Sequence, residues 1–155
     1  MNTAPSATGD IPPHVRELAG FLDVLGRGDG PGILWPEEER PADGRPDAVA
    51  ALTAEARALE RLTGTPVTIE THRADEGGNR PMSAGSAGRL LVRHTAGAGS
   101  WTLLTGTGRA AQDSFRCRLR SDEVLYVPPG WRWHAHLTPH ARLTLTRLGP
   151  PAAHR

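Results

Sequence analysis

The chain of 155 residues contains no lysine, so all 18 of its basic residues are arginine. This absence excludes a Schiff-base lysine and a lysine clamp for anions. Any recognition of a carboxylate must therefore use the planar guanidinium of arginine. Cys117 is the single cysteine, which excludes an internal disulfide and is typical of a reducing compartment. We expect a cytoplasmic protein.

Long apolar runs and a charge imbalance are also missing. No run approaches the roughly 20 apolar residues that span a bilayer, and residues 1–10 lack the basic and apolar regions of a secretory signal. We therefore expect no membrane partner. The chain has 18 basic and 17 acidic residues, so its net charge is +1. This near balance argues against a nucleic-acid partner. No nucleophile elbow, phosphate loop or paired-cysteine zinc motif occurs.

The spacing of apolar residues changes once along the chain. Residues 11–25 and 47–63 repeat them at helical spacing, which predicts two helices that end at Gly26 and Gly64. After Gly64 the period is two, which predicts an antiparallel barrel or sandwich of about seven short strands. These strands are expected at residues 67–72, 90–95, 101–105, 115–120, 124–127, 131–137 and 141–148.

The remaining segments are rich in glycine and proline. Residues 74–88 predict a long loop, and Ile33-Leu34-Trp35 is an apolar island expected to hold another loop on the core. Residues 1–10 and 149–155 are expected to be a disordered lead and a disordered tail. The chain is thus divided into a helical segment, 11–64, that packs on a barrel, 65–148.

The most specific stretch is Asp122-Glu-Val-Leu-Tyr-Val-Pro-Pro-Gly-Trp-Arg-Trp-His-Ala-His. A strand ends at a Pro-x-Gly bend and a histidine comes after it on the next strand. This resembles the second motif of the cupin superfamily, and in detail the Jumonji-C-like cupins of the ribosomal-oxygenase type. The segments 56–72 and 89–104 are similar to the family's earlier elements in the same order. The resemblance implies a double-stranded β-helix, a cupin or jelly-roll barrel, preceded by two short helices.

The departures from that family decide what the resemblance implies for chemistry. Such oxygenases hold iron with His-x-Asp/Glu from one strand and a distal His from another, leaving positions for 2-oxoglutarate and oxygen. The segment 79–88, where His-x-Asp should fall, has no His, Asp or Glu. The distal element reads Pro-Pro-Gly-Trp-Arg-Trp-His, one residue longer than Pro-x-Gly-x-x-His. One added residue reverses the faces of the later strand residues unless a bulge absorbs it.

Two histidines after the bend are the first candidates for a site. His134 and His136 share one strand face with Arg132, while Trp131 and Trp133 share the other. The imidazoles then point into the barrel, as metal ligands or with His134 as a catalytic group, and the tryptophans pack under the helices. The alternative is that the histidine face is solvated.

Other candidate residues lie on the remaining strands. His72 and Glu70 share a face and are expected to complete a metal site of Fe or Zn with the two histidines after the bend, unless theirs is an ordinary polar face. His94 is a candidate general base or a half-buried pocket wall. Arg147 is a candidate partner for a bound carboxylate, by spacing alone. A role for 2-oxoglutarate is not expected.

A stripe of arginines runs along one strand. Arg116, Arg118 and Arg120 alternate with apolar residues, and three arginines turned inward would repel one another, so we expect an outward, solvated face.

The functional hypothesis is a Jumonji-C-like cupin enzyme of oxygenase lineage whose iron triad has eroded. Its barrel pocket would bind a small molecule or peptide, with a non-standard histidine metal site. Two alternatives remain open, a non-catalytic cupin that binds a ligand or partner and a metal-free cyclase or isomerase. The binding alternative includes a homodimer formed through the sheets.

Overall fold

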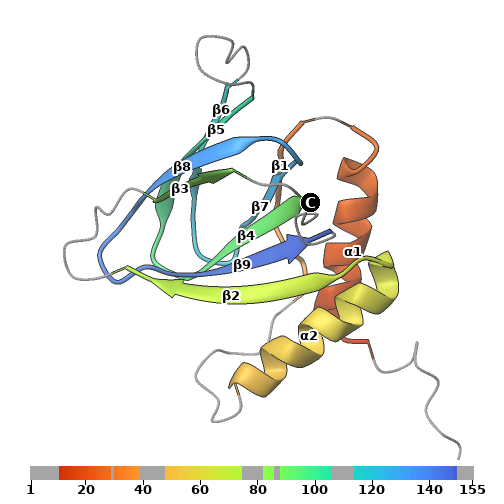
Figure 1. Ribbon diagram of the computed structural model, residues 1–155. Coiled ribbons are helices and arrows are strands. Elements are labelled where there is room, and N and C mark those ends of the chain that lie inside the picture. The colour runs from red at the N-terminus through yellow and green to blue at the C-terminus, as the bar shows by residue number, and fades with distance from the viewer. Residues whose placement is uncertain are drawn as a thin grey trace, which may run out of the picture.

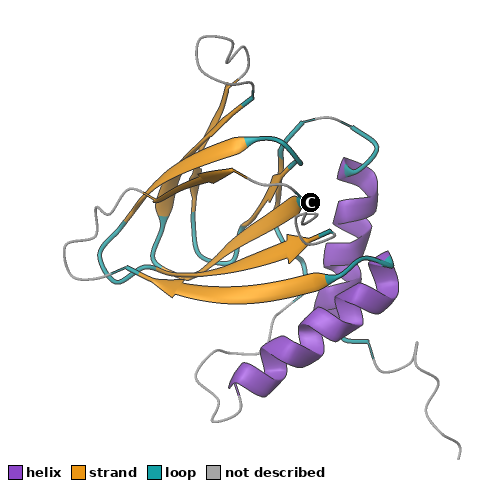
Figure 2. Ribbon diagram, viewed as in Figure 1, coloured by secondary structure: helices purple, strands orange, loops and turns teal. Residues whose placement is uncertain are grey.

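The computed structural model describes residues 11–28, 30–38, 48–74, 82–85, 88–105 and 114–149. Two antiparallel sheets face each other, and two helices cover the outer side of one of them (Figures 1 and 2). The predicted mainly β fold with two preceding helices is confirmed. The predicted lead, 1–10, and the predicted tail beyond Gly149 lie outside the described residues.

Helix α1 (Pro13–Leu25) begins with proline in its first turn, where the fixed φ of proline suits a helix and no backbone N–H is lost. Its buried face carries Val15, Leu18 and Leu22, as the spacing predicts. The helix ends where the N–H of Gly26 donates to the carbonyl of Leu22 at 2.8 Å.

Helix α2 (Ala48–Thr63) ends at Gly64, whose φ of 71° lies in the left-handed region that glycine adopts without strain. The apolar stripe predicted along α2 is corrected at both ends. Val49 is 79% exposed and Leu62 is 39% exposed, while Leu59 is fully buried. The helix therefore packs mainly through its second half. Neither described helix has the length and apolar character needed to cross a lipid bilayer.

The strands form two sheets whose order is that of a double-stranded β-helix, which confirms the fold implied by the resemblance. The strands that follow α2 alternate between the two sheets, apart from one hairpin that pairs residues 99–104 with residues 114–119. The five-stranded sheet contains, in order, β1 (Gly32–Leu34), β7 (Val124–Val127), β4 (Arg89–Ala96), β9 (Arg142–Leu148) and β2 (Val67–Arg73). The four-stranded sheet contains β3 (Met82–Gly85), β8 (Arg132–Leu137), β5 (Gly99–Leu104) and β6 (Ser114–Leu119).

Two of these strands are not predicted by the sequence. Strand β1 pairs with β7 within the expected apolar island, and β3 pairs with β8 within the expected loop 74–88. Both have three or four residues and contain glycine, so a period of two cannot be recognised in them. Their strand conformation comes from hydrogen bonding to distant partners, which local sequence does not encode.

Apolar residues form two cores, one on each side of the five-stranded sheet. The helix-side core joins α1 and α2 to that sheet, and it includes Leu91 and Tyr126. The core between the sheets includes Trp101 and Trp133. In the described part of the chain no helix lies over the outer face of the four-stranded sheet (Figure 2).

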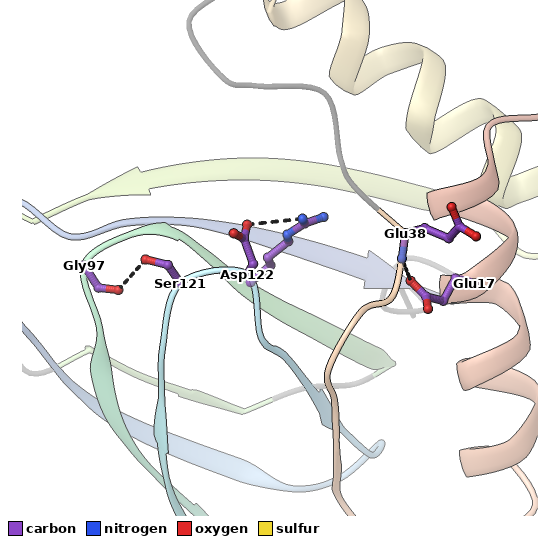
Figure 3. Close-up of polar contacts among 6 residues, drawn as sticks. Glu17, Glu38, Gly97, Ser121 and Asp122 are labelled. Carbon is purple, nitrogen blue, oxygen red and sulfur yellow. Dashed lines mark hydrogen bonds and ion pairs between the residues drawn. The ribbon is translucent and has the colours of Figure 1, made fainter.

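Turns close one end of the barrel. The hydroxyl of Ser121 donates to the carbonyl of Gly97 at 3.0 Å, and the guanidinium of Arg93 lies 3.3 Å from the carboxylate of Asp122 (Figure 3). The N–H of Asp122 also donates to the carbonyl of His94 at 2.7 Å. These contacts join the β4–β5 turn to the β6–β7 turn beside a predicted site residue.

A separate contact holds the segment after β1 on the first helix. The carboxylate of Glu17 in α1 accepts the backbone N–H of Glu37 at 2.9 Å. It also accepts the backbone N–H of Glu38 at 3.3 Å, which Figure 3 shows.

Candidate functional site

Strand β8 comes after the proline–glycine bend, and its side chains alternate between two environments. Trp133 is 3% exposed and belongs to the core between the sheets. His134 and His136 lie on the opposite, outer face, where His136 is exposed and His134 half-buried. The expectation that the imidazoles point into the barrel is therefore wrong, and so is the expectation that Trp133 packs under the helices.

The register of β8 explains this reversal. It pairs with β5 without a shift, from Gly99 opposite Leu137 to Leu104 opposite Arg132, so no bulge absorbs an added residue. Counted from Pro128, the spacing Pro-x-Gly-x-x-His places its histidine at Trp133. An indole therefore occupies the inward position that the related motif gives to a metal ligand.

His94 is the predicted site residue that does lie inside the barrel. It has 0% exposure on β4, and its Nε2 accepts the indole N–H of Trp101 at 3.0 Å. The Cβ of any residue replacing Gly99 would lie 3.0 Å from this ring, so the imidazole uses the space that glycine leaves. The environment is that of an enclosed core residue.

The protonation of His94 is set by these contacts. An indole N–H only donates, so Nε2 must be an acceptor, and the proton of the neutral ring is on Nδ1. Burial lowers the pKa of His94 to about 4, because the charged form is poorly solvated there. Nδ1 has no hydrogen-bond partner among the described residues.

A second group of predicted residues meets at the sheet edge formed by β2. An oxygen of the Glu70 carboxylate lies 3.3 Å from Nε2 of His72, and the other lies 3.5 Å from Nε of Arg147. All three side chains are partly exposed. Arg147 thus already faces a carboxylate of this chain, which competes with the bound acid that the spacing suggests for it.

The four predicted metal ligands form two separate pairs. Nε2 of His134 lies 2.9 Å from Nε2 of His136 on the outer face of the four-stranded sheet, whereas Glu70 and His72 lie on an edge strand of the other sheet. Within the described ranges no three His, Cys, Asp or Glu side chains gather as a metal site requires. The prediction of one shared site is corrected, because the face reversal on β8 turns its two imidazoles away from β2.

The residues of the barrel interior do not fit the iron that the resemblance implies. Trp133 replaces the distal histidine, and β3 has no His, Asp or Glu to replace the missing His-x-Asp. The His94 ring has Nε2 engaged by Trp101, and among the described residues it belongs to no group of three side chains that could hold a metal ion.

The outer face of the four-stranded sheet holds an arrangement that the sequence did not reveal. Ser100 of β5 lies between Arg118 of β6 and His136 of β8. Two residues along, Thr102 lies between Arg116 and His134.

We call these two sets of side chains the two Arg–hydroxyl–His rows, of which one is Arg118–Ser100–His136 and the other is Arg116–Thr102–His134. The arginines are exposed, as expected, but the rows depend on the register of three strands. No pattern within one segment gives that register.

A groove of about 270 Å³ opens at one end of this face. Its lining includes all three members of one row, Ser100, Arg118 and His136, together with Thr138 and Pro139 of the next turn. The concave surface next to the rows is therefore polar and cationic.

No protein-family model and no curated protein matches the sequence. Solved structures do resemble it. RmlC from Streptococcus suis in complex with dTDP-D-xylose is 10% identical with a TM-score of 0.45, over 56% of this chain and 45% of that chain. Drosophila melanogaster CENP-C bound to CAL1 is 10% identical with a TM-score of 0.43, over 52% and 64%. Streptomyces albus HEPD with 2-hydroxyethylphosphonate and Fe(II) is 15% identical with a TM-score of 0.42, over 56% and 19%.

The chain thus spans less than two thirds of the length of each of these proteins. Their ligands differ in kind, and identities of this size concern the fold alone. By the strand order of its two sheets, the chain has a cupin-type double-stranded β-helix.

Proposed function

We propose that the chain is a non-catalytic cupin module that binds its ligand on the outside of the barrel. The observation that carries this proposal is the inward position of Trp133, which fills the place of a metal ligand with an indole ring that has no lone pair to bind a metal. Its ring centroid lies 5.1 Å from that of Trp101, so two large indoles pack together between the sheets. A packed centre supports a structural role for the interior.

The environment of His94 supports the same conclusion. A general base must come within hydrogen-bonding reach of the proton that it removes. His94 has no exposed surface, and its Nε2 lone pair is engaged by Trp101. A substrate would have to displace both the indole and the surrounding core to reach it.

In this proposal the barrel descends from Jumonji-C-like cupins. The motif around the proline–glycine bend supports that ancestry. Loss of the ligands from β3, and tryptophan in place of the distal histidine, are the changes expected when a barrel keeps its shape without its metal.

The experiment measures access to the barrel. Acrylamide quenching of tryptophan fluorescence is compared between a Trp35→Phe/Trp131→Phe variant, which reports on Trp101 and Trp133, and the wild type. We expect the two interior indoles to resist quenching, while Trp35, which is 67% exposed, is quenched readily. Quenching of the interior indoles to the extent of Trp35 would contradict a packed centre.

A metal measurement provides the second arm. The full chain is loaded with Fe(II), Zn(II), Ni(II) or Mn(II), desalted and analysed for metal. We expect well below one ion per chain. Retention of one ion per chain that is lost in His94→Gln would overturn the proposal.

One observation favours a second candidate, the metal-free isomerase or cyclase. Nδ1 of His94 and Nε1 of Trp133 are both buried donors without a hydrogen-bond partner among the described residues. Two unpaired donors inside a barrel would suit a carbonyl or carboxylate oxygen. An NMR screen of small ketones and acids tests this candidate, since a true guest would shift both ring signals and lose its effect in Trp133→Phe.

A further inference from the structure

We propose that the outer face of the four-stranded sheet is a binding site for a phosphate-bearing small molecule, held by the two Arg–hydroxyl–His rows. The inference deepens the proposed function and rests on it, since it names what an outside-binding module would hold. It uses residues on three neighbouring strands, and none of them belongs to the barrel interior.

The charge of this sheet is the first argument. Strands β3, β5, β6 and β8 together contain Arg116, Arg118 and Arg132 and no Asp or Glu. Their formal charge is therefore +3 with neutral imidazoles, although the net charge of the whole chain is only +1. Like charges on one sheet face destabilise it, so this concentration of guanidinium groups favours an anionic occupant.

The arrangement of donors is the second argument. Neighbouring strands lie about 4.8 Å apart, so a guanidinium and an imidazole on either side of a serine or threonine can converge above its hydroxyl. Each row supplies a guanidinium, which can bind in a bidentate way, and a hydroxyl, and both groups bind phosphate oxygens. The two imidazoles share a hydrogen bond between their Nε2 atoms at 2.9 Å, so the ring N–H that the neutral pair leaves free is on a single Nδ1. The second row repeats the first about 7 Å further along the strands, at two residues of about 3.4 Å each.

The groove is the third argument. At about 270 Å³ it approaches the lower end of the roughly 300–1,000 Å³ range of small-molecule pockets. Arg118, Ser100 and His136 line it directly. The groove lies beside one row and the second row continues along the strands from it, which suits a phosphate with a further group attached.

The same residues argue against other occupants. The paired imidazoles resemble a metal chelate, but Arg132 on the same face of β8, and Arg116 and Arg118 on β6 two strands away, would repel a cation. A nucleic-acid strand requires an extended basic surface, whereas the net charge of this chain is close to zero. A compact phosphate group matches the local excess of positive charge on this sheet.

The experiment titrates the full chain with inorganic pyrophosphate and monitors backbone amide signals by NMR. We expect saturable shifts at Ser100, Arg118 and His136. Arg118→Gln should weaken binding about tenfold, as expected for the loss of a charge-assisted hydrogen bond. Arg142→Gln is the matched control, because Arg142 is an exposed arginine on the other sheet, and it should leave the affinity unchanged.

Three results would overturn the inference. They are the absence of saturable shifts, equal weakening by Arg118→Gln and Arg142→Gln, and tighter binding of a short single-stranded RNA than of pyrophosphate. Failure of the phosphate-binding inference can be distinguished from failure of the proposed function, because indole quenching and metal content decide the proposed function. Pyrophosphate binding to a chain that also retained metal at His94 would uphold this site and overturn only the proposed function.

Discussion

Trp101 donates its indole N–H to Nε2 of His94 at 3.0 Å, between two strands of opposite sheets. The two rings meet edge to face, with centroids 6.1 Å apart. The bond fixes the tautomer of the histidine and joins the sheets through a polar contact within an otherwise apolar core. Its loss would leave a buried acceptor unpaired, which is more costly than the loss of an exposed bond.

Replacing Trp101 by phenylalanine should lower the free energy of unfolding by about 1–3 kcal/mol from the unpaired acceptor, with a further loss from the smaller ring. Urea denaturation measures the change. Trp35→Phe is the control, since Trp35 is largely exposed and its indole N–H donates to the carboxylate of Glu123 at the surface, so its substitution should cost below about 0.5 kcal/mol. Equal losses in the two variants would contradict a structural role for the buried bond.

The lowered pKa of His94 predicts a loss of stability in mild acid. The folded protein holds this ring neutral down to a pKa of about 4, whereas the unfolded chain binds the proton near 6.5. Stability from this group is therefore complete above pH 6.5 and declines as pH falls toward 4, by about 3 kcal/mol in total. Urea denaturation between pH 4 and pH 7 measures it.

A His94→Gln variant should lose this pH dependence between pH 5 and pH 7, where few carboxylates titrate. If the variant does not fold, the ring carbon signals of wild-type His94 provide the answer, since they should keep their neutral positions at pH 5. Protonation of that ring near pH 6.5 in the folded protein would contradict the prediction.

The sequence was sufficient for the features that depend on local patterns. The spacing of Val15, Leu18 and Leu22 predicted α1, and the change of period at Gly64 located the start of the barrel. The segments β1 and β3 were missed because three or four residues carry too short a pattern. The exposure of Val49 was missed because spacing alone does not say how far along a helix the sheet extends beneath it.

The candidate site was harder to predict, since it depends on strand faces and register. A one-residue difference in counting from the bend decides whether Trp133 or His134 points inward. The sequence raised this question, and only the pairing of β8 with β5 answers it. The rows that place Ser100 between Arg118 and His136 combine three strands, so no single motif contains them.

Replacing Trp133 by histidine tests whether the missing ligand alone accounts for the loss of the metal site. The smaller ring leaves a cavity and buries a polar group, so stability should fall by about 3–5 kcal/mol. Metal retention should not appear, because β3 supplies no His, Asp or Glu to complete a site. Metal analysis and urea denaturation measure both effects. Retention of one metal ion per chain would contradict this prediction and show that residues outside β3 complete a site.

Gly99 should be intolerant of even one methyl group. A Cβ there would lie 3.0 Å from two atoms of the His94 ring and 3.0 Å from a methyl group of Leu137. Gly99→Ala should therefore cost about 1–3 kcal/mol from overpacking.

Gly20 offers the matched control, because it lies within α1 and nothing approaches its Cβ position within 4 Å. Gly20→Ala should stabilise the protein by about 0.5–1 kcal/mol, since alanine loses less conformational entropy in a helix. Thermal denaturation of both variants gives the comparison. Similar shifts of the same sign would mean that the ring of His94 does not depend on the space at Gly99.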